Sequence, residues 1–268
     1  MRTRRFGAPG FGFGLDLTPT LRKLLVANFA VWFVQLAFAW AGRDTMMELF
    51  AFHSDRALPW RPWQFVTYMF LHSAPPGPWH PFHLLLNMLM LAIFGGPVER
   101  ELGSRRFLRY YVLCGVAGAT LSLLPPFHGT TVGASAAILG VLTAFGLFYP
   151  DTPVLLFFFL PIPARILVLF LALFNLMAAA GSLQDGTAYI AHVGGMAAGY
   201  VMLRGLPYGR GIRRRWSARA EARRVARRAE LRSRMDAVLD KLHREGRDSL
   251  TRDEWNTLLD ESKRMRKD

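Results

Sequence analysis

The chain has 268 residues, of which 52% are hydrophobic and 19% charged, and its formal net charge at pH 7 is +14. An apolar fraction this high argues against an ordinary soluble protein and favours a membrane protein. The single cysteine, Cys114, excludes an internal disulfide and any cysteine-based metal site or redox pair.

The charges are unevenly distributed along the chain. From about Leu24 to Met202 long intervals carry almost no charge, whereas the part that follows is densely charged. We therefore expect three parts: a cytoplasmic N-terminal segment over 1–23, a membrane domain over 24–204 and a basic cytoplasmic helical tail over 205–268.

Six apolar segments are candidates for membrane-spanning helices, since a helix needs about 20 mostly apolar residues to cross the hydrocarbon core. They are 24–41, 81–98, 106–124, 134–149, 163–180 and 188–204. The fourth and sixth are short, which is tolerable for helices that lie among other helices. The sequence predicts an all-α, polytopic bundle of six transmembrane helices.

The first segment, "LLVANFAVWFVQLAFAWAGRD", follows basic residues and ends in a small-x-small pattern, as a signal peptide does. Its apolar run of about 18 residues exceeds the usual 7–15 of such peptides. We interpret it as a retained first membrane helix.

Lysine and arginine concentrate on one side of the predicted spans, and this asymmetry predicts orientation. Basic residues precede the first span, lie between the second and third, and follow the sixth. They are Arg2, Arg4, Arg5, Arg22, Lys23, Arg100, Arg105, Arg106 and the tail after Arg204. The connections 125–132 and 181–187 contain neither residue type. We expect both termini in the cytoplasm, with these connections and 42–80 outside.

The 42–80 connection is the longest, and its stretch "LPWRPWQFVTYMFLH" is amphipathic and aromatic. Tryptophan and tyrosine are typical of the headgroup zone, so we expect this stretch near the membrane surface. The following "SAPPGPWHP" cannot form regular helix because its prolines lack the backbone donor. We expect a turn there.

Four polar side chains stand inside the predicted membrane core: His83, Asn87, Ser135 and His192. Such residues are costly at membrane depth and are functional candidates for that reason. His83 and Asn87 are spaced i, i+4 and share one helical face. Ser135 lies near a helix N-terminus, where unpaired backbone donors favour negative charge. Together these groups can stabilise an oxyanion beside the serine.

His192 is followed by Gly195 and Gly199, a small-x-x-x-small spacing that lets two membrane helices approach closely. The residues around Gly133 and Gly140 offer a matching smooth surface on the helix of Ser135. If these surfaces pack, His192 can act as general base to the serine and then as acid to the leaving amine.

Simpler interpretations exist for each residue alone. A membrane serine commonly bonds to a carbonyl of its own helix, and a Gly-x-x-x-Gly pair is commonly structural. A metal site could use His53, His72, His80, His83 or His128. The chain has no His-Glu-x-x-His helix and no core carboxylate to complete such a site, so we expect no metal and no cofactor. The joint placement of the four polar residues toward the outer half favours catalysis.

These motifs resemble those of the rhomboid intramembrane serine proteases. The similar pieces occur in the family's order, from "WQFVTYMFLH" through "HPFHLLLNM", "FGGPVERELGSRRFLRYY" and "GASAAILG" to "AHVGGMAAG". The resemblance implies a Ser135–His192 dyad without a third acid, and an oxyanion hole from Asn87, His83 and the Ser135 backbone. It implies hydrolysis of peptide bonds in or beside transmembrane segments of membrane-protein substrates. We expect an integral, multi-pass protein of a bacterial inner membrane.

Three features depart from the family's pattern. Ala136 stands where glycine is usual, and Leu139 where many members have an aromatic residue against the catalytic histidine. The "SAPPGPWHP" segment is longer than usual. These departures affect rate and substrate preference more than mechanism. The alternatives from other classes are a rhomboid-like protein that binds membrane helices without cutting them, and a transporter, although the chain lacks paired core charges or a repeat of broken helices.

The tail begins with the alanine- and arginine-rich "RRRWSARAEARRVARRAELRSR". We expect a helix attracted to anionic headgroups and no nucleic-acid binding, since interleaved aromatic residues are missing. Further on, Gly246 suits a helix stop, and Thr251 with Glu254 has the spacing of a capping box. We expect a small helical hairpin there.

Overall fold

A computed structural model describes residues 17–55, 61–73, 80–124, 129–156, 160–181 and 187–204, together with parts of 218–255. It separates the chain into two compact units, Met1–Ile212 and Arg213–Asp268. Outside the described residues lie the N-terminal segment up to residue 16, the proline-containing stretch 74–79 and the basic stretch 205–217. The expectations for these segments therefore stay predictions.

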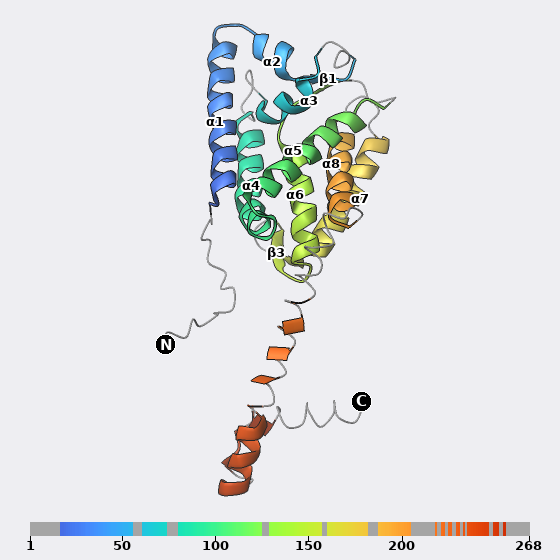
Figure 1. The fold of residues 1–268 in the computed structure, drawn as a ribbon. Helices are drawn as coiled ribbons and strands as arrows, with labels where there is room; N and C mark the ends of the chain where they lie inside the picture. Colours follow the sequence, from blue (N-terminus) through green and yellow to red (C-terminus); the bar gives the residue numbers. More distant parts are fainter. Residues whose placement is uncertain are drawn as a thin grey trace. The chain divides into compact units, whose positions relative to one another are not determined.

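The first unit is mainly helical (Figure 1). Its long helices are α1 (Pro19–Trp40), α4 (His80–Leu102), α5 (Ser104–Leu121), α6 (Ser135–Phe148), α7 (Ala164–Gly181) and α8 (Thr187–Arg204). Each coincides with one of the six predicted spans. The largest shift is at α1, which begins earlier than the predicted residue 24 because Pro19 at its first position suits a helix start.

Short elements join these helices. They are α2 (Thr45–Phe50), β1 (Phe52–His53), α3 (Gln64–Thr67), the 3-10 turn η1 (Tyr68–Phe70), β2 (Thr130–Thr131), β3 (Pro153–Leu156) and β4 (Leu160–Pro163). Both strand pairs are antiparallel, β1 with β2 and β3 with β4. The unit is therefore not purely helical, because the connections satisfy part of their backbone by pairing with each other.

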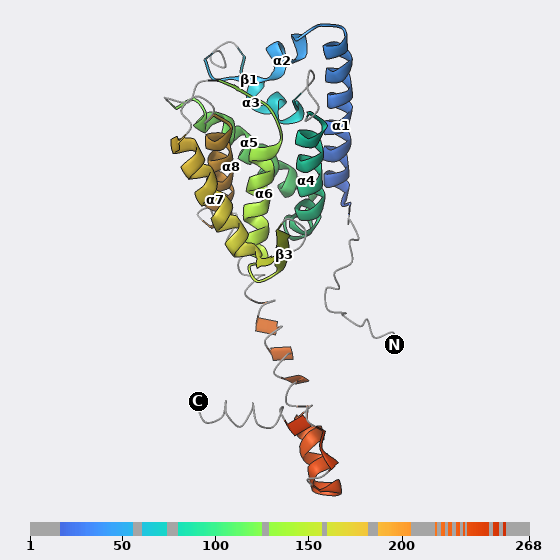
Figure 2. The same ribbon diagram turned by 180° about the vertical axis from the view of Figure 1, so that it is seen from behind.

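Helix α6 lies in the middle of the bundle and contacts α4, α5, α7 and α8, whereas α1 packs against α4 and α5 at its edge (Figures 1 and 2). Most residues of α6 are buried. This position explains why a helix of only 14 residues suffices, since it is surrounded by protein.

Three helical stretches of the described chain are long and apolar enough to cross a membrane: Pro19–Trp40, Pro81–Leu102 and Ala164–Gly181. Helix α6 is apolar but shorter. Helix α5 begins with arginines, and α8 is rich in glycine and alanine, which lowers its hydropathy while smoothing its surface. The prediction of six spans therefore exceeds what length and composition alone support.

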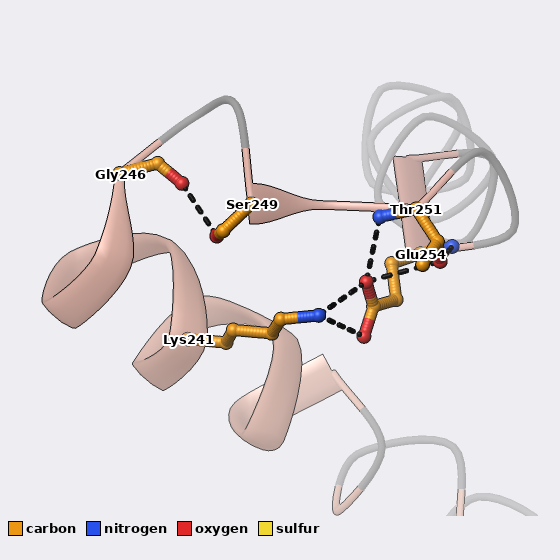
Figure 3. A network of polar contacts seen from close by, with 5 residues as sticks. All are labelled: Lys241, Gly246, Ser249, Thr251 and Glu254. Carbon is orange, nitrogen blue, oxygen red and sulfur yellow. Dashed lines mark hydrogen bonds and ion pairs between the residues drawn. The ribbon is translucent and has the colours of Figure 1, made fainter.

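The second unit is described in part. Its helical residues around 235–245 end at Gly246, whose φ of +83° suits a residue without a side chain. Thr251 and Glu254 make the reciprocal bonds of a capping box: Thr251 N donates to Glu254 Oε2 (2.8 Å) and Glu254 N donates to Thr251 Oγ1 (3.3 Å). Figure 3 shows Lys241 directed at the same carboxylate, at 2.9 Å, which ties the capping box to the preceding helix.

Candidate active site

Ser135 is the first residue of α6, and the backbone before it is built for a sharp entry. Gly133 has φ +112°, a conformation that side chains disfavour, and its N–H donates to the carbonyl of Tyr68 at 2.9 Å. The pairing of β1 with β2 holds the chain just upstream. The serine therefore lies at a helix N-terminus whose first N–H groups have no partner within the helix.

His192 of α8 reaches this serine directly. The Ser135 Oγ and His192 Nε2 atoms lie 2.6 Å apart, a hydrogen-bond distance, and both residues are half-buried. A serine hydroxyl held this close to an imidazole nitrogen can transfer its proton and become a nucleophile.

The contact depends on small residues between α6 and α8. A Cβ on Gly195 would overlap the carbonyl oxygen of Ala136, and one on Gly199 would come 3.1 Å from the carbonyl oxygen of Gly140. The two predicted packing glycines thus lie where the helix backbones nearly touch.

His83 and Asn87 of α4 face the turn before Ser135. A Cβ on Gly133 would lie 2.8 Å from His83 Nε2 and 3.7 Å from Asn87 Nδ2. The Ser73 Oγ pairs with His83 Nδ1 at 3.0 Å, and when that hydroxyl donates, the ring proton is on Nε2. Asn87 Nδ2 also donates to the carbonyl of His83 at 3.0 Å, which leaves its second hydrogen for another acceptor. The turn therefore has two side-chain donors beside it.

Asn175 of α7 is a site residue that the sequence interpretation missed. Its Oδ1 lies 2.7 Å from Nδ1 of His192, on the side of the ring opposite Ser135. The sequence could have predicted it, because Asn175 is the polar residue in the apolar run "LFLALFNLMAAAG". The same signal, a polar residue at membrane depth, had selected the four predicted site residues.

Ala136 and Leu139, the two residues near the serine that depart from the family's pattern, can be compared with their surroundings in the structure. The Ala136 side chain packs toward Gly118 of α5, because a Cβ added to Gly118 would lie 2.7 Å from the Cβ of Ala136. Its methyl group thus serves helix packing. The aromatic contact to His192 comes from Tyr189 of α8 instead of position 139, with ring centroids 6.3 Å apart and planes at 89°.

Three of the histidines considered for a metal site, His53, His72 and His83, have described side chains. Within the described ranges no three histidine, cysteine or carboxylate side chains form a group that could hold a metal. His53 pairs with Thr130, and the ring of His72 packs edge-on against that of His83. His128 and the His80 side chain lie outside the described residues.

Comparison with known proteins gives one family. The model of the Rhomboid domain matches residues 59–208, more than half of the chain. The chain is 38% identical over 125 residues to "Rhomboid protein 1, mitochondrial" of Saccharomyces cerevisiae, covering 44% of this chain and 36% of that protein. It is 31% identical over 98 residues to "Rhomboid-like protease 3" of Toxoplasma gondii, covering 37% and 35%.

A bacterial relative is also similar. "Rhomboid protease AarA" of Providencia stuartii is 27% identical over 152 residues, which cover 49% of this chain and 51% of that protein. The chain thus matches between about a third and a half of the length of these three relatives. The match to the Rhomboid domain supports a polytopic helical membrane protein.

Proposed function

The chain belongs to the rhomboid family, as its motifs predicted, and from this premise we propose that it is an intramembrane serine endopeptidase. The observation that carries the proposal is the 2.6 Å contact between Ser135 Oγ and His192 Nε2. A hydroxyl that served only helix packing would bond to a carbonyl of its own helix, as Thr143 does with Leu139.

In the proposed reaction, Ser135 Oγ attacks the carbonyl carbon of the scissile peptide bond while its proton moves to His192 Nε2. The oxygen that becomes negative is stabilised by the backbone at the start of α6 and by donors from His83 and Asn87. His192 then protonates the leaving amine, the C–N bond breaks, and an ester on Ser135 remains. Water, deprotonated by His192, hydrolyses that ester and restores the serine.

The proposed substrates are membrane proteins cut in or near a transmembrane segment. A regular helix hides its carbonyl groups in hydrogen bonds, so a substrate segment that unwinds easily should be preferred.

We further propose six spans, α1 and α4 to α8, with both termini in the cytoplasm. Glu99 near the end of α4 accepts hydrogen bonds from the start of α1 and from Ser104 at the start of α5, so these ends are adjacent. The basic residues Arg22, Arg100 and Arg105 belong to that end, which the positive-inside rule assigns to the cytoplasm. Ser135 begins α6, whose opposite end contacts Glu101 through Tyr149, so the serine faces the outer side.

The test compares cleavage of a model transmembrane substrate in proteoliposomes by wild type, Ser135→Ala and His192→Ala. We expect both variants to lose activity by at least about 10³-fold. Ser122→Ala is the matched control, because Ser122 Oγ is buried and bonds back to Gly118 O at 3.1 Å. A fluorophosphonate should label wild type and not Ser135→Ala.

Cleavage that persists in Ser135→Ala would refute the proposal. So would a folded wild type that neither cleaves nor reacts with the probe. If that wild type still binds transmembrane helices, and Ser135→Ala binds equally well, the chain is a rhomboid-like binding protein.

A further inference from the structure

Asn175 is a buried amide on a helix that exposes many of its apolar side chains. It is 4% exposed, whereas its neighbours Phe174 and Leu176 are 51% and 53% exposed. An amide in apolar surroundings destabilises a fold unless its polar atoms are hydrogen-bonded. Both polar atoms of Asn175 have a partner.

The two hydrogen bonds define which way the amide points. Nδ2 lies 2.7 Å from the carbonyl oxygen of Leu171, which can only accept, so the nitrogen must occupy that side. Oδ1 is then the atom that lies 2.7 Å from His192 Nδ1. An amide oxygen only accepts, so His192 must carry its proton on Nδ1.

This proton position determines what His192 can do. In the neutral ring a proton on Nδ1 leaves the lone pair on Nε2, the atom that lies 2.6 Å from Ser135 Oγ. The opposite tautomer would present an N–H to the serine and could not accept its proton.

We propose that Asn175 is a positioning residue for the general base: it holds His192 in the tautomer and ring orientation that accept the Ser135 proton. The proposal rests on the proposed protease function. It adds a third, neutral member from α7 to the Ser135–His192 pair. When Nε2 takes up the serine proton, the Nδ1–H still donates to Asn175 Oδ1, so the ring need not move during the reaction.

A purely structural role is the competing explanation, since asparagine commonly joins membrane helices by hydrogen bonds. The two roles differ in what they affect. Helix joining contributes to stability, whereas positioning changes kcat and the His192 tautomer without a matching change in KM.

The chain offers a matched control in Asn28 of α1. This side chain is also buried, and its Nδ2 donates to Leu24 O four residues earlier, at 2.8 Å. Asn28→Leu and Asn175→Leu therefore each remove a buried amide with the same local bond, and only the second contacts the base.

The conservative variant is Asn175→Asp. An ionised aspartate accepts from Nδ1–H through either oxygen, and a protonated one can donate to Leu171 O and accept from Nδ1–H, as asparagine does. The acceptor is kept in both states, so this variant should restore what Asn175→Leu loses.

The experiment measures kcat, KM and the melting temperature of the full chain in proteoliposomes, and the 15N shifts of the His192 ring nitrogens, assigned with His192→Gln. For Asn175→Leu we expect kcat to fall by on the order of 10²-fold with KM within about threefold, and the Nδ1-protonated ring signal to be lost or mixed. Asn175→Asp should keep that signal and stay within about tenfold of the wild-type kcat. Asn28→Leu should change the melting temperature alone.

The proposal is overturned if folded Asn175→Leu keeps the wild-type kcat, or if its His192 tautomer matches that of wild type. It is also overturned if Asn28→Leu lowers kcat equally, because that would indicate a general effect of destabilisation. If wild type has no protease activity, the proposed function fails, and the 15N shifts of wild type and Asn175→Leu still decide whether Asn175 sets the tautomer.

Discussion

Gly195 of α8 lies against Ala136 of α6 so closely that a Cβ on the glycine would overlap the Ala136 carbonyl oxygen. The obstacle is backbone, which cannot move aside as a flexible side chain can. Since Ala136 directly follows Ser135 and Gly195 is one turn from His192, this contact sets the separation of the nucleophile and the base.

Gly195→Ala should therefore reduce both stability and activity. We expect a loss of about 3 kcal/mol or more in the free energy of unfolding in mixed micelles, at the upper end for overpacked sites. The kcat should fall as well, because the Ser135–His192 contact lengthens. Gly181→Ala at the end of α7 is the control, since nothing lies within 4 Å of its added Cβ. Equal stability of the two variants would contradict this account.

The donors beside Gly133 predict a second effect. Removing one oxyanion donor typically costs about 10²–10³-fold in kcat, so Asn87→Ala and His83→Ala should each lower kcat by this order with little change in KM. Steady-state kinetics on a model substrate measures both parameters. A change confined to KM would indicate that these side chains bind the substrate instead of stabilising the developing charge.

Hydropathy predicted the long helices. The polar residues at membrane depth predicted four site candidates, which the structure brings close together. Both signals are local: an apolar run specifies a helix, and a buried polar group requires a partner. The short strands were not foreseeable in this way, because Phe52 pairs with Thr131 only when the tertiary fold brings the two connections together.

Asn175 and Glu99 show the limit of local patterns. The apolar run of α7 predicts a helix, but its rotation, which directs Asn175 toward His192, depends on packing against α8. In the sequence Glu99 lies in a charged connection between two predicted spans, whereas in the structure the residue is buried, with 2% of its surface exposed. Which helix ends meet around it is a property of the assembled bundle.

The Glu99 carboxylate joins three helix ends. It accepts from the N–H groups of Thr20 (3.0 Å) and Leu21 (2.9 Å), and from the hydroxyls of Thr18 and Ser104. Two orphan donors at the N-terminus of α1 are thereby satisfied by a residue of α4. No side chain at the N-cap of α1 performs this role.

Glu99→Ala should therefore destabilise the fold by about 2–4 kcal/mol, since charge-assisted hydrogen bonds contribute about 1.5–3 kcal/mol each and donors would be left unpaired. Chemical unfolding in micelles measures the loss. Exposed Glu48→Ala serves as the control for removing a carboxylate. An unchanged unfolding midpoint in Glu99→Ala would show that water replaces the carboxylate without penalty.

Buried His72 predicts that the fold is sensitive to acid. It lies in the connection between α1 and α4, is fully buried, and exchanges two hydrogen bonds with Gln35 through its backbone, at 2.5 and 3.1 Å. Burial, with a smaller contribution from nearby His83, lowers the pKa of the His72 ring to about 4 from its usual 6.5. The folded protein thus resists protonation of a ring that the unfolded chain protonates readily.

The sign of the pH dependence follows from linkage. Above about pH 6.5 both states hold the ring neutral, and as the pH falls from there toward about 4 only the unfolded state gains the proton, so stability declines. Between pH 8 and pH 5 the decline due to His72 should be about 2 kcal/mol. His72→Gln, which keeps a neutral polar side chain, should unfold with a correspondingly weaker pH dependence, and His243→Gln in the second unit is the control for replacing an exposed histidine. An undiminished pH dependence in His72→Gln would place the acid sensitivity elsewhere in the protein.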